Sequence, residues 1–312
     1  MVQGLRVVPF SKEAQQTLAR ELVAGTSRLL AAADWRRDPA GRSRVLRGRY
    51  HTARGFLVSL ATGAVGTAPV GGRRQADVSR LYERRWGGAP EPQSRFVEFG
   101  GAVLTTDEDQ PVNGFYIMAL AHLIRLTRPA RVLEVGSGKG FNLNHLAPLF
   151  PECQFVGLEL TSAGVREAKQ RRDDPAIMRR AHEKFSATFP VGTRADSGPM
   201  FCRGSAARLP FPDGSFDLVV SVLALEQMNP IRSAVLAEMA RVTRAMVAQV
   251  EPFAEFNRNV FARMHLRNKD YFRTPVAALT EFGLQPVFTW GGFPQKLHFG
   301  AGLVVSQKQS AP

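Results

Sequence analysis

Residues 131–140 read RVLEVGSGKG, and this stretch decides the fold class of the chain. The apolar residues before Gly136 predict a buried strand, and the amphipathic segment 141–150 predicts a helix. Between them, glycines at alternate positions remove Cβ atoms where the backbone bends with positive φ and where a ligand approaches it closely. Because a helix N-terminus presents free N–H groups to an anionic ligand group, we expect a nucleoside-containing cofactor to bind here.

The spacing of these glycines narrows the choice of cofactor. The dinucleotide fingerprint is G-x-G-x-x-G, with an acid about 20 residues later. Here the glycines are Gly136, Gly138 and Gly140, so the third comes one residue early. Glu134 lies just before the turn, where a carboxylate accepts from an ammonium or a sugar hydroxyl but repels a pyrophosphate. A cofactor with an amino-acid end and no phosphate therefore fits better.

The segment resembles motif I of class I S-adenosylmethionine (SAM)-dependent methyltransferases, E/D-x-G-x-G-x-G. Two later segments are similar to blocks of the same family, in family order. Residues 154–159 form an apolar run that ends in an acid. Residues 201–221 resemble the block G-D-A-x-x-L-P-F-x-D-x-S-F-D-x-V, in the form found in ubiquinone-biosynthesis-like enzymes, which mostly methylate small molecules. The resemblance covers residues 112–308.

This resemblance implies a site for SAM and its product S-adenosylhomocysteine. Glu159 is expected to accept both ribose hydroxyls, as the acid after the second strand does in Rossmann-like sheets. Ser205 stands where the family often has an Asp that bonds the adenine amino group, and a hydroxyl makes that contact more weakly. Tyr116 is expected beside the methionine end. The implied cofactor residues are Tyr116, Glu134, Gly136, Ser137, Gly138, Gly140, Glu159, Leu160, Ser205, Ala206 and Ser221.

The pattern along the chain predicts a βαβ alternation. Strands are expected at 131–135, 154–159, 200–203, 217–222, 246–251, 284–290 and 299–306. Helices are expected at 11–33, 77–86, 111–127, 162–172, 175–185 and 231–243. The Gly- and Arg-rich stretch at 36–72 is expected to be mostly irregular or broken by short helices. The resemblance implies an α/β, Rossmann-like seven-stranded sheet of order 3-2-1-4-5-7-6 with the last strand antiparallel. Residues 1–93 are expected to form a basic, mainly helical cap that ends in a linker at 87–93, and residues 94–312 the SAM-binding domain.

The chain has 312 residues and a net charge of +14, which is unevenly distributed. Residues 1–100 hold 17 basic and 8 acidic side chains, and no acid occurs between Pro39 and Ala76. Such a region attracts an anionic partner: a phosphate, a carboxylate, RNA or a membrane surface. It is equally typical of a chain that uses arginine as its general solubilising residue.

Several classes of protein are disfavoured by composition. No apolar run reaches 18 residues, and the N-terminus lacks the features of a signal peptide, so a cytoplasmic protein without a membrane span is expected. Cys153 and Cys202 make neither a disulfide framework nor a metal site and are expected to be buried, so no metal is predicted. The sequence does not indicate the oligomeric state.

Candidate substrate residues follow the predicted fourth and fifth strands, because ligands of open α/β sheets lie outside the C-terminal strand ends. Glu226 fits a general base or a substrate-orienting carboxylate, and the alternative is a helix-start acid that interacts with the helix dipole. Glu251 fits substrate binding or a helix cap. His265 fits a general base or a structural histidine. Gln227 and Tyr271 are further substrate-binding candidates, and Tyr271 fits simple packing as well.

Two functions compete. The first is transfer of a methyl group from SAM, by in-line displacement, to a small-molecule acceptor of secondary metabolism that carries a phosphate or carboxylate. The alternative is an RNA methyltransferase that binds phosphates through the Arg-rich N-terminal region. Against it, only Tyr50 and Phe56 are aromatic between residues 39 and 76, and no RNA-binding module is recognisable. A non-catalytic protein with the same fold is disfavoured by the intact glycine turn and Glu159.

Overall fold

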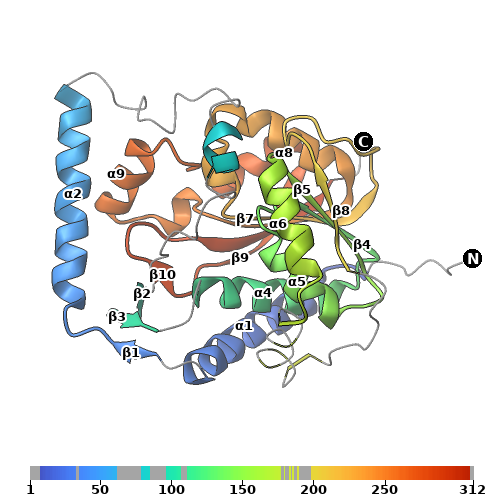
Figure 1. Ribbon diagram of the computed structural model, residues 1–312, viewed down its shortest axis with the longest axis horizontal. Helices are drawn as coiled ribbons and strands as arrows, with labels where there is room; N and C mark the ends of the chain where they lie inside the picture. The colour runs from blue at the N-terminus through green and yellow to red at the C-terminus, as the bar shows by residue number, and fades with distance from the viewer. Residues whose placement is uncertain are drawn as a thin grey trace, which may run out of the picture.

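The computed structural model is built around one twisted sheet of seven strands (Figure 1). It describes residues 8–32, 35–61, 79–84, 96–106, 111–176, 179, 183, 185, 188–189 and 198–309. The strands are β4 (Arg131–Val135), β5 (Gln154–Glu159), β6 (Met200–Arg203), β7 (Phe216–Val222), β8 (Thr243–Glu251), β9 (Leu284–Trp290) and β11 (Gly302–Lys308). Their order is β6-β5-β4-β7-β8-β11-β9. β11 runs antiparallel to both neighbours, which confirms the predicted order and the antiparallel last strand.

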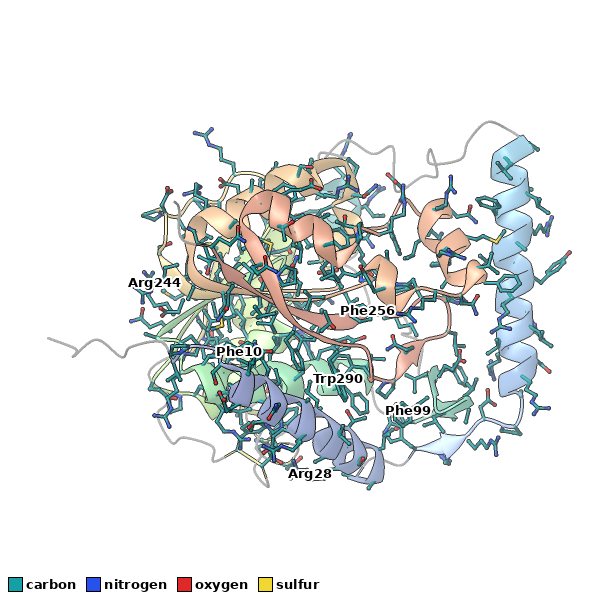
Figure 2. The ribbon with its side chains drawn as sticks, turned by 180° about the vertical axis from the view of Figure 1, so that it is seen from behind. Phe10, Arg28, Phe99, Arg244, Phe256 and Trp290 are labelled. Carbon is teal, nitrogen blue, oxygen red and sulfur yellow. The ribbon has the colours of Figure 1, made fainter. Side chains whose placement is uncertain are left out.

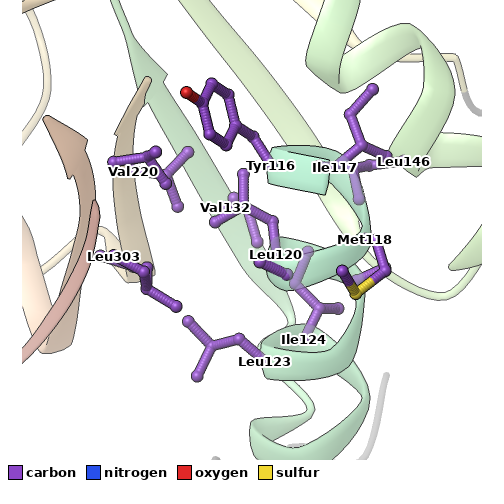
Figure 3. Close-up of a cluster of buried hydrophobic side chains, with 14 of the residues drawn as sticks. Tyr116, Ile117, Met118, Leu120, Leu123, Ile124, Val132, Leu146, Val220 and Leu303 are labelled. Carbon is purple, nitrogen blue, oxygen red and sulfur yellow. The ribbon is translucent and has the colours of Figure 1, made fainter. Parts of the chain in front are cut away.

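Helices cover both faces of the sheet, as expected when parallel strands are apolar on both sides. One face carries α4 (Pro111–Thr127), α5 (Phe141–Leu146), the turn η1 (Ala147–Leu149) and α6 (Ser162–Arg172). Figure 3 shows part of this core, in which α4 side chains pack against β4, β7 and β11. The other face carries α8 (Arg232–Val242) and η5 (Val276–Phe282). Short turns η2 (Leu225–Gln227), η3 (Asn229–Ile231) and η4 (Ala254–Phe256), and helix α9 (Val260–Asn268), lie in the connections after β7 and β8.

The first helix, α1 (Lys12–Ala32), packs against α4 (Figure 1). Its buried Leu18 and Leu22 belong to the same hydrophobic cluster as α4 and the sheet. This part of the predicted cap therefore shares the core of the predicted cofactor domain. The predicted linker at 87–93 lies outside the described residues.

Residues 41–61 form a single helix of 21 residues, α2 (Gly41–Ala61), so the prediction that 36–72 is mostly irregular or broken by short helices is wrong there. The glycines that suggested irregular structure serve close packing instead. A Cβ on Gly41 would lie 2.6 Å from Val103 Cβ, and one on Gly48 would lie 3.1 Å from His298 Cε1. Asp38 supports the helix start by accepting from the backbone N–H of Ala40. Helix α2 packs against α9.

A second, small sheet was not predicted from the sequence. It has the order β1-β3-β2-β10, with β1 Arg36–Arg37, β2 Phe96–Phe99, β3 Ala102–Thr105 and β10 Gln295–Lys296. β2 and β3 form a hairpin whose turn residues Gly100 and Gly101 have φ of 56° and 75°. Positive φ at both central positions is what a tight two-residue hairpin turn requires. Because β10 lies between β9 and β11, the small sheet ties the N-terminal region to the end of the main sheet.

The other predicted elements were found near their expected limits, among them helices 111–127 and 162–172 and the five parallel strands. The strand expected at 299–306 begins three residues later. Residues 79–84 are helical, inside the predicted helix 77–86, whereas most of 175–185 lies outside the described residues. Cys153 is buried and Cys202 half-buried, and both are free thiols. Within the described ranges, no helix is long and apolar enough to cross a membrane.

Candidate cofactor and methyl-transfer site

The glycine turn connects β4 to α5 in the predicted conformation. Gly136, Gly138 and Gly140 have φ of 76°, 53° and 68°, all in the left-handed region. The turn is anchored to the next strand, because the N–H groups of Gly136 and Ser137 both donate to Leu158 O. A Cβ on Gly136 would lie 2.6 Å from Ala224 Cβ. The glycine therefore allows the loop after β7 to pack directly onto the turn.

Glu134, at the end of β4, is a buried carboxyl group beneath this turn. Its Oε1 accepts from Asn142 Nδ2 at 2.6 Å, and its Oε2 has no hydrogen-bond partner among the described residues. Burial raises the pKa of Glu134 to about 7; the Asn142 hydrogen bond opposes this shift, and the nearby Glu159 adds to it. A buried acceptor oxygen without a donor fits a ligand that brings one.

Glu159 ends β5 on the other side of the turn. Its Oε2 accepts from Gly138 N at 3.1 Å, and its Oε1 accepts from both the N–H and the hydroxyl of Thr161. A carboxylate has about four acceptor positions, so Oε2 has a free lone pair while Oε1 is already shared. Binding both ribose hydroxyls, as predicted, would require the Thr161 hydroxyl to release Oε1.

The residues expected around the adenine lie beside Glu159. Gly204 N donates to Glu159 O, which joins the turn after β6 to the end of β5. Ala206 is buried in this turn, and the Ser205 hydroxyl accepts from Ala207 N at 3.3 Å. The carbonyl oxygen of Leu160 accepts from Arg203 Nε. Because these residues and the glycine turn meet at Glu159, the predicted cofactor residues of β4, β5 and β6 form one continuous edge.

The loop after β7 brings together Glu226, Glu251 and Tyr116. Glu251 is fully buried, and its Oε1 accepts from the N–H groups of Ala224 and Leu225. Burial is the main cause that raises the pKa of Glu251 to about 8, and the negative charge of Glu226 adds to it. The pKa of Tyr116 is raised by burial and by both carboxylates. In Figure 3 its hydroxyl points away from the apolar cluster. Glu251 thus caps this loop, while its role in substrate binding stays a prediction.

Two further features mark the loop as specialised. Leu223, the residue that follows β7, has φ of 49°, a conformation that costs a bulky side chain energy and that often occurs at functional sites. Gln227 Nε2 donates to Glu226 Oε1 at 3.0 Å, so the two predicted substrate residues form a pair. Ser221 is fully buried near the end of β7, and its hydroxyl has no hydrogen-bond partner among the described residues.

His265 and Tyr271 lie in an aromatic group beside α9. The His265 ring stacks on His298 at 5.3 Å and on Phe299 at 6.0 Å, and Tyr271 meets it edge-on. Burial, together with His298 and Lys269, lowers the pKa of His265 to about 4, so the ring is neutral at pH 7. Tyr271 is connected to the carboxylate pair through its neighbour Phe272, whose N–H donates to Glu226 O.

The sequence interpretation missed several polar residues of the site. Asn142 holds Glu134, and Thr161 holds Glu159. Gln249 is fully buried on β8 in register with Ser221, and neither of its amide atoms has a hydrogen-bond partner among the described residues. Thr161 lies two residues after the end of β5, and Asn142 is the second residue of α5, directly after the glycine turn; these positions are the signal that would have found them. In the part of the chain that the structure describes, no group of three or more His, Cys, Asp or Glu side chains is placed to hold a metal ion.

We predict that Glu251→Gln makes the protein more stable than the wild type at alkaline pH. The pKa of Glu251 is about 8 in the folded chain, against 4.5 for the ordinary carboxyl. The unfolded chain therefore ionises first, and the folded state loses stability as pH rises from about 5 to 8, by a few kcal/mol on an order-of-magnitude estimate. Glutamine keeps the acceptor for Ala224 and Leu225 but does not ionise. Urea unfolding between pH 5 and pH 9 measures the difference.

The control is Glu238→Gln. The pKa of Glu238 is lowered, first by its hydrogen bond from Arg241, so it is ionised in both states above pH 6. Its stability difference from the wild type should stay constant between pH 6 and pH 9. A constant difference for Glu251→Gln over the same range would contradict the raised pKa.

Comparison with known proteins finds a family model that matches part of this chain. Residues 133–246 match the family model described as "Methyltransferase domain". A malonyl-[acyl-carrier protein] O-methyltransferase from Laribacter hongkongensis is 35% identical over 116 residues, which are 37% of this chain and 34% of the relative. A fatty-acid O-methyltransferase from Mycolicibacterium smegmatis is 32% identical over 114 residues, 36% of this chain and 33% of the relative. In both cases the match spans about a third of the relative's length.

Among solved structures, the [4+2]-cyclase SpnF aligns with a TM-score of 0.50 and 14% sequence identity, over 77% of this chain and 98% of the cyclase. At this identity the similarity concerns the fold alone. Since that protein is described as a cyclase, the shared architecture does not determine the reaction, and function has to be argued from the site.

Proposed function

We propose that this chain transfers a methyl group from SAM to an oxygen atom of a small-molecule acceptor, in keeping with the match of residues 133–246 to the "Methyltransferase domain" model. One observation carries the proposal: the left-handed glycine turn lies over a buried carboxyl group, Glu134, whose Oε2 lacks a donor among the described residues. This edge of the sheet supports SAM as the methyl donor. The oxygen acceptor is suggested by the names of the two relatives, which are both O-methyltransferases.

The residues present fit SAM. Glu134 offers an acceptor to the ammonium of its methionine end, and the free lone pair on Glu159 Oε2 offers one to a ribose hydroxyl. Gly136 lets the loop after β7 pack directly onto the turn beside these acceptors. Ser137 Oγ is buried without a hydrogen-bond partner among the described residues and adds a further polar group. The cofactor supplies the reactive methyl group when it is bound, and the chain aligns the acceptor with it.

Glu226 is the residue that we assign to the acceptor side. It lies on the loop that packs onto the glycine turn, and its charge acts on both Glu251 and Tyr116. If the acceptor is a hydroxyl group, Glu226 takes the proton that the oxygen loses; a carboxylate acceptor has no proton to lose. His265, with a pKa of about 4, is a poor acceptor of protons at pH 7 and is the weaker candidate.

The test is methyl transfer from tritiated SAM to a protein-free small-molecule extract and, in a parallel reaction, to total RNA, with the product identified by mass spectrometry. We expect one methyl group on an oxygen atom. For a hydroxyl acceptor, Glu226→Gln should lower kcat about 100-fold or more without weakening S-adenosylhomocysteine binding. Glu255→Gln is the control, because Glu255 instead accepts from Val276 N on the neighbouring turn. Label that enters RNA instead, with RNA binding that weakens steeply with salt, would overturn this proposal in favour of an RNA methyltransferase.

A further inference from the structure

A pocket separate from the glycine turn lies where α2, α9, the β2–β3 hairpin and the β9–β11 connection meet. Its volume is about 420 Å³, within the range of small-molecule sites. Five of its lining residues are phenylalanines: Phe99, Phe256, Phe261, Phe293 and Phe299. Figure 2 labels Phe99 on the hairpin and Phe256 on the turn after β8, on the side of the molecule where α2 and α9 lie. We call this pocket the phenylalanine pocket.

The glycines of the wall make the pocket possible. Gly100 and Gly101 form the tip of the hairpin, and Gly291 and Gly292 follow β9. None of the four has a side chain, so the backbone itself forms that part of the wall. The part of the wall that consists of phenylalanine rings and bare backbone accepts a flat or extended apolar body, because such a body buries its surface against the rings.

The charges on the wall are two cations and one carboxylate. Arg49 lies over the Phe261 ring at 5.4 Å, and Lys296 Nζ lies 5.2 Å from the centre of the Phe299 ring. Neither makes an ion pair with any residue that the structure describes, and the same is true of Glu98, the carboxylate of the lining. The pKa of His298 is lowered by burial and by Lys269, so its ring is neutral at pH 7. The wall therefore has a net positive charge of one, beside apolar rings.

The phenylalanine pocket adjoins the residues assigned to methyl transfer. Phe293 lines the pocket, and its ring meets the Tyr116 ring edge-on at 5.4 Å. The pKa of Tyr116 is raised partly by Glu226 and Glu251, which places these carboxylates near its hydroxyl. Phe299, also on the wall, packs against both His265 and Tyr271. Side chains of the wall thus contact three of the residues predicted from the sequence.

We propose that the phenylalanine pocket holds the methyl acceptor, and that this acceptor has an apolar body and an anionic group paired with Arg49 and Lys296. The body of the acceptor then packs on Phe293, and the oxygen that takes the methyl group extends past this ring toward Tyr116 and the methyl-transfer residues. That the ligand of this pocket accepts a methyl group rests on the proposed function. Binding of an apolar anion in the pocket does not depend on it.

The test uses three naphthalene probes titrated calorimetrically into the full chain: 2-naphthoate, 2-naphthyl phosphate and the uncharged 2-naphthylmethanol. The carboxylate and the phosphate distinguish the two kinds of anionic group. We expect at least one anion to bind about tenfold more tightly than the alcohol, as hydrogen bonds between charged groups would give. Arg49→Gln and Lys296→Gln should each remove most of this difference in affinity between anion and alcohol. Phe293→Ala should weaken the binding of all three probes.

The matched control is Arg47→Gln, because Arg47 is an exposed arginine of the same helix outside the pocket lining. It should leave all three affinities unchanged. Equal affinity for anions and alcohol, no binding of any probe, or an equal loss in Arg47→Gln would overturn the proposal. Titration with S-adenosylhomocysteine runs in parallel: if it fails to bind the wild type, the proposed function fails while the probe result stands independently.

Discussion

Replacing Gly136 by valine should abolish binding of S-adenosylhomocysteine, with a loss of affinity of about 100-fold or more. Two physical causes act together. The φ of 76° is unfavourable for any residue with a Cβ, at a cost of about 1–2 kcal/mol. In addition, a Cβ at this position would lie 2.6 Å from Ala224 Cβ and 3.3 Å from Met228 Cε. Either the turn or the loop after β7 must move, and both border the cofactor residues. Isothermal titration calorimetry measures the loss.

The control for this prediction is Gly283→Ala. Gly283 also has a left-handed conformation, with φ of 70°, but a Cβ there would have nothing within 4 Å. Both variants therefore bear the same kind of backbone cost, and only Gly136→Val has a clash in the site. We expect Gly283→Ala to lower the thermal midpoint while binding S-adenosylhomocysteine like the wild type. If circular dichroism shows that Gly136→Val is folded and the variant binds S-adenosylhomocysteine with wild-type affinity, the cofactor assignment is wrong.

The parallel part of the sheet could be predicted from the sequence to within a few residues. Strands such as β4 and β5 are short apolar runs, because both of their faces are buried. Each has an acid at or next to its last position and is followed by a turn. The limits of these strands can therefore be recognised from the apolar run itself and from the acid and turn that follow it. The cofactor edge follows from the same local signals, since Glu134 and Glu159 are the last polar residues of their strands.

The N-terminal region could not be predicted in the same way, because its structure depends on distant contacts. In α2, Gly41 and Gly48 appeared as helix breakers, yet each makes room for a neighbour from another part of the chain, Val103 and His298. β10 has only two residues and pairs with β2, almost two hundred positions earlier. No periodicity exists in two residues, so a pairing of this kind leaves no trace in the local pattern.

The same distinction applies to the two halves of the candidate site. The residues at the glycine turn come from consecutive strand ends, and their spacing is recognisable. The wall of the phenylalanine pocket comes from α2, the hairpin, α9 and the β9–β11 connection. Each contributes a few residues that are ordinary in their own segment, such as Phe261 on a helix or Lys296 on a short strand. Their combination follows from the tertiary structure alone, and this explains why the sequence indicates the methyl donor more clearly than the acceptor.

The affinity for S-adenosylhomocysteine should rise with pH, by about tenfold between pH 6 and pH 8. The pKa of Glu134 is raised to about 7 by burial, so the carboxyl group is mostly protonated at pH 6 and mostly ionised at pH 8. An ammonium group on the ligand binds the ionised form and lowers the pKa of Glu134 in the complex. Binding must therefore release protons: close to one per site at pH 6, and only a small fraction of one per site at pH 8. Calorimetry in two buffers of different ionisation enthalpy counts these protons directly.

Two variants separate this effect from a general loss of structure. Glu134→Gln should bind about 30-fold more weakly or worse and should lose the pH dependence between 6 and 8, because no group titrates beneath the turn. Asn142→Leu removes the hydrogen bond that lowers the pKa of Glu134, so the midpoint of the affinity profile should move to higher pH. A merely structural defect would weaken binding equally at every pH. If Glu134→Gln keeps the wild-type pH profile, another group is responsible, and Glu134 does not bind the ammonium.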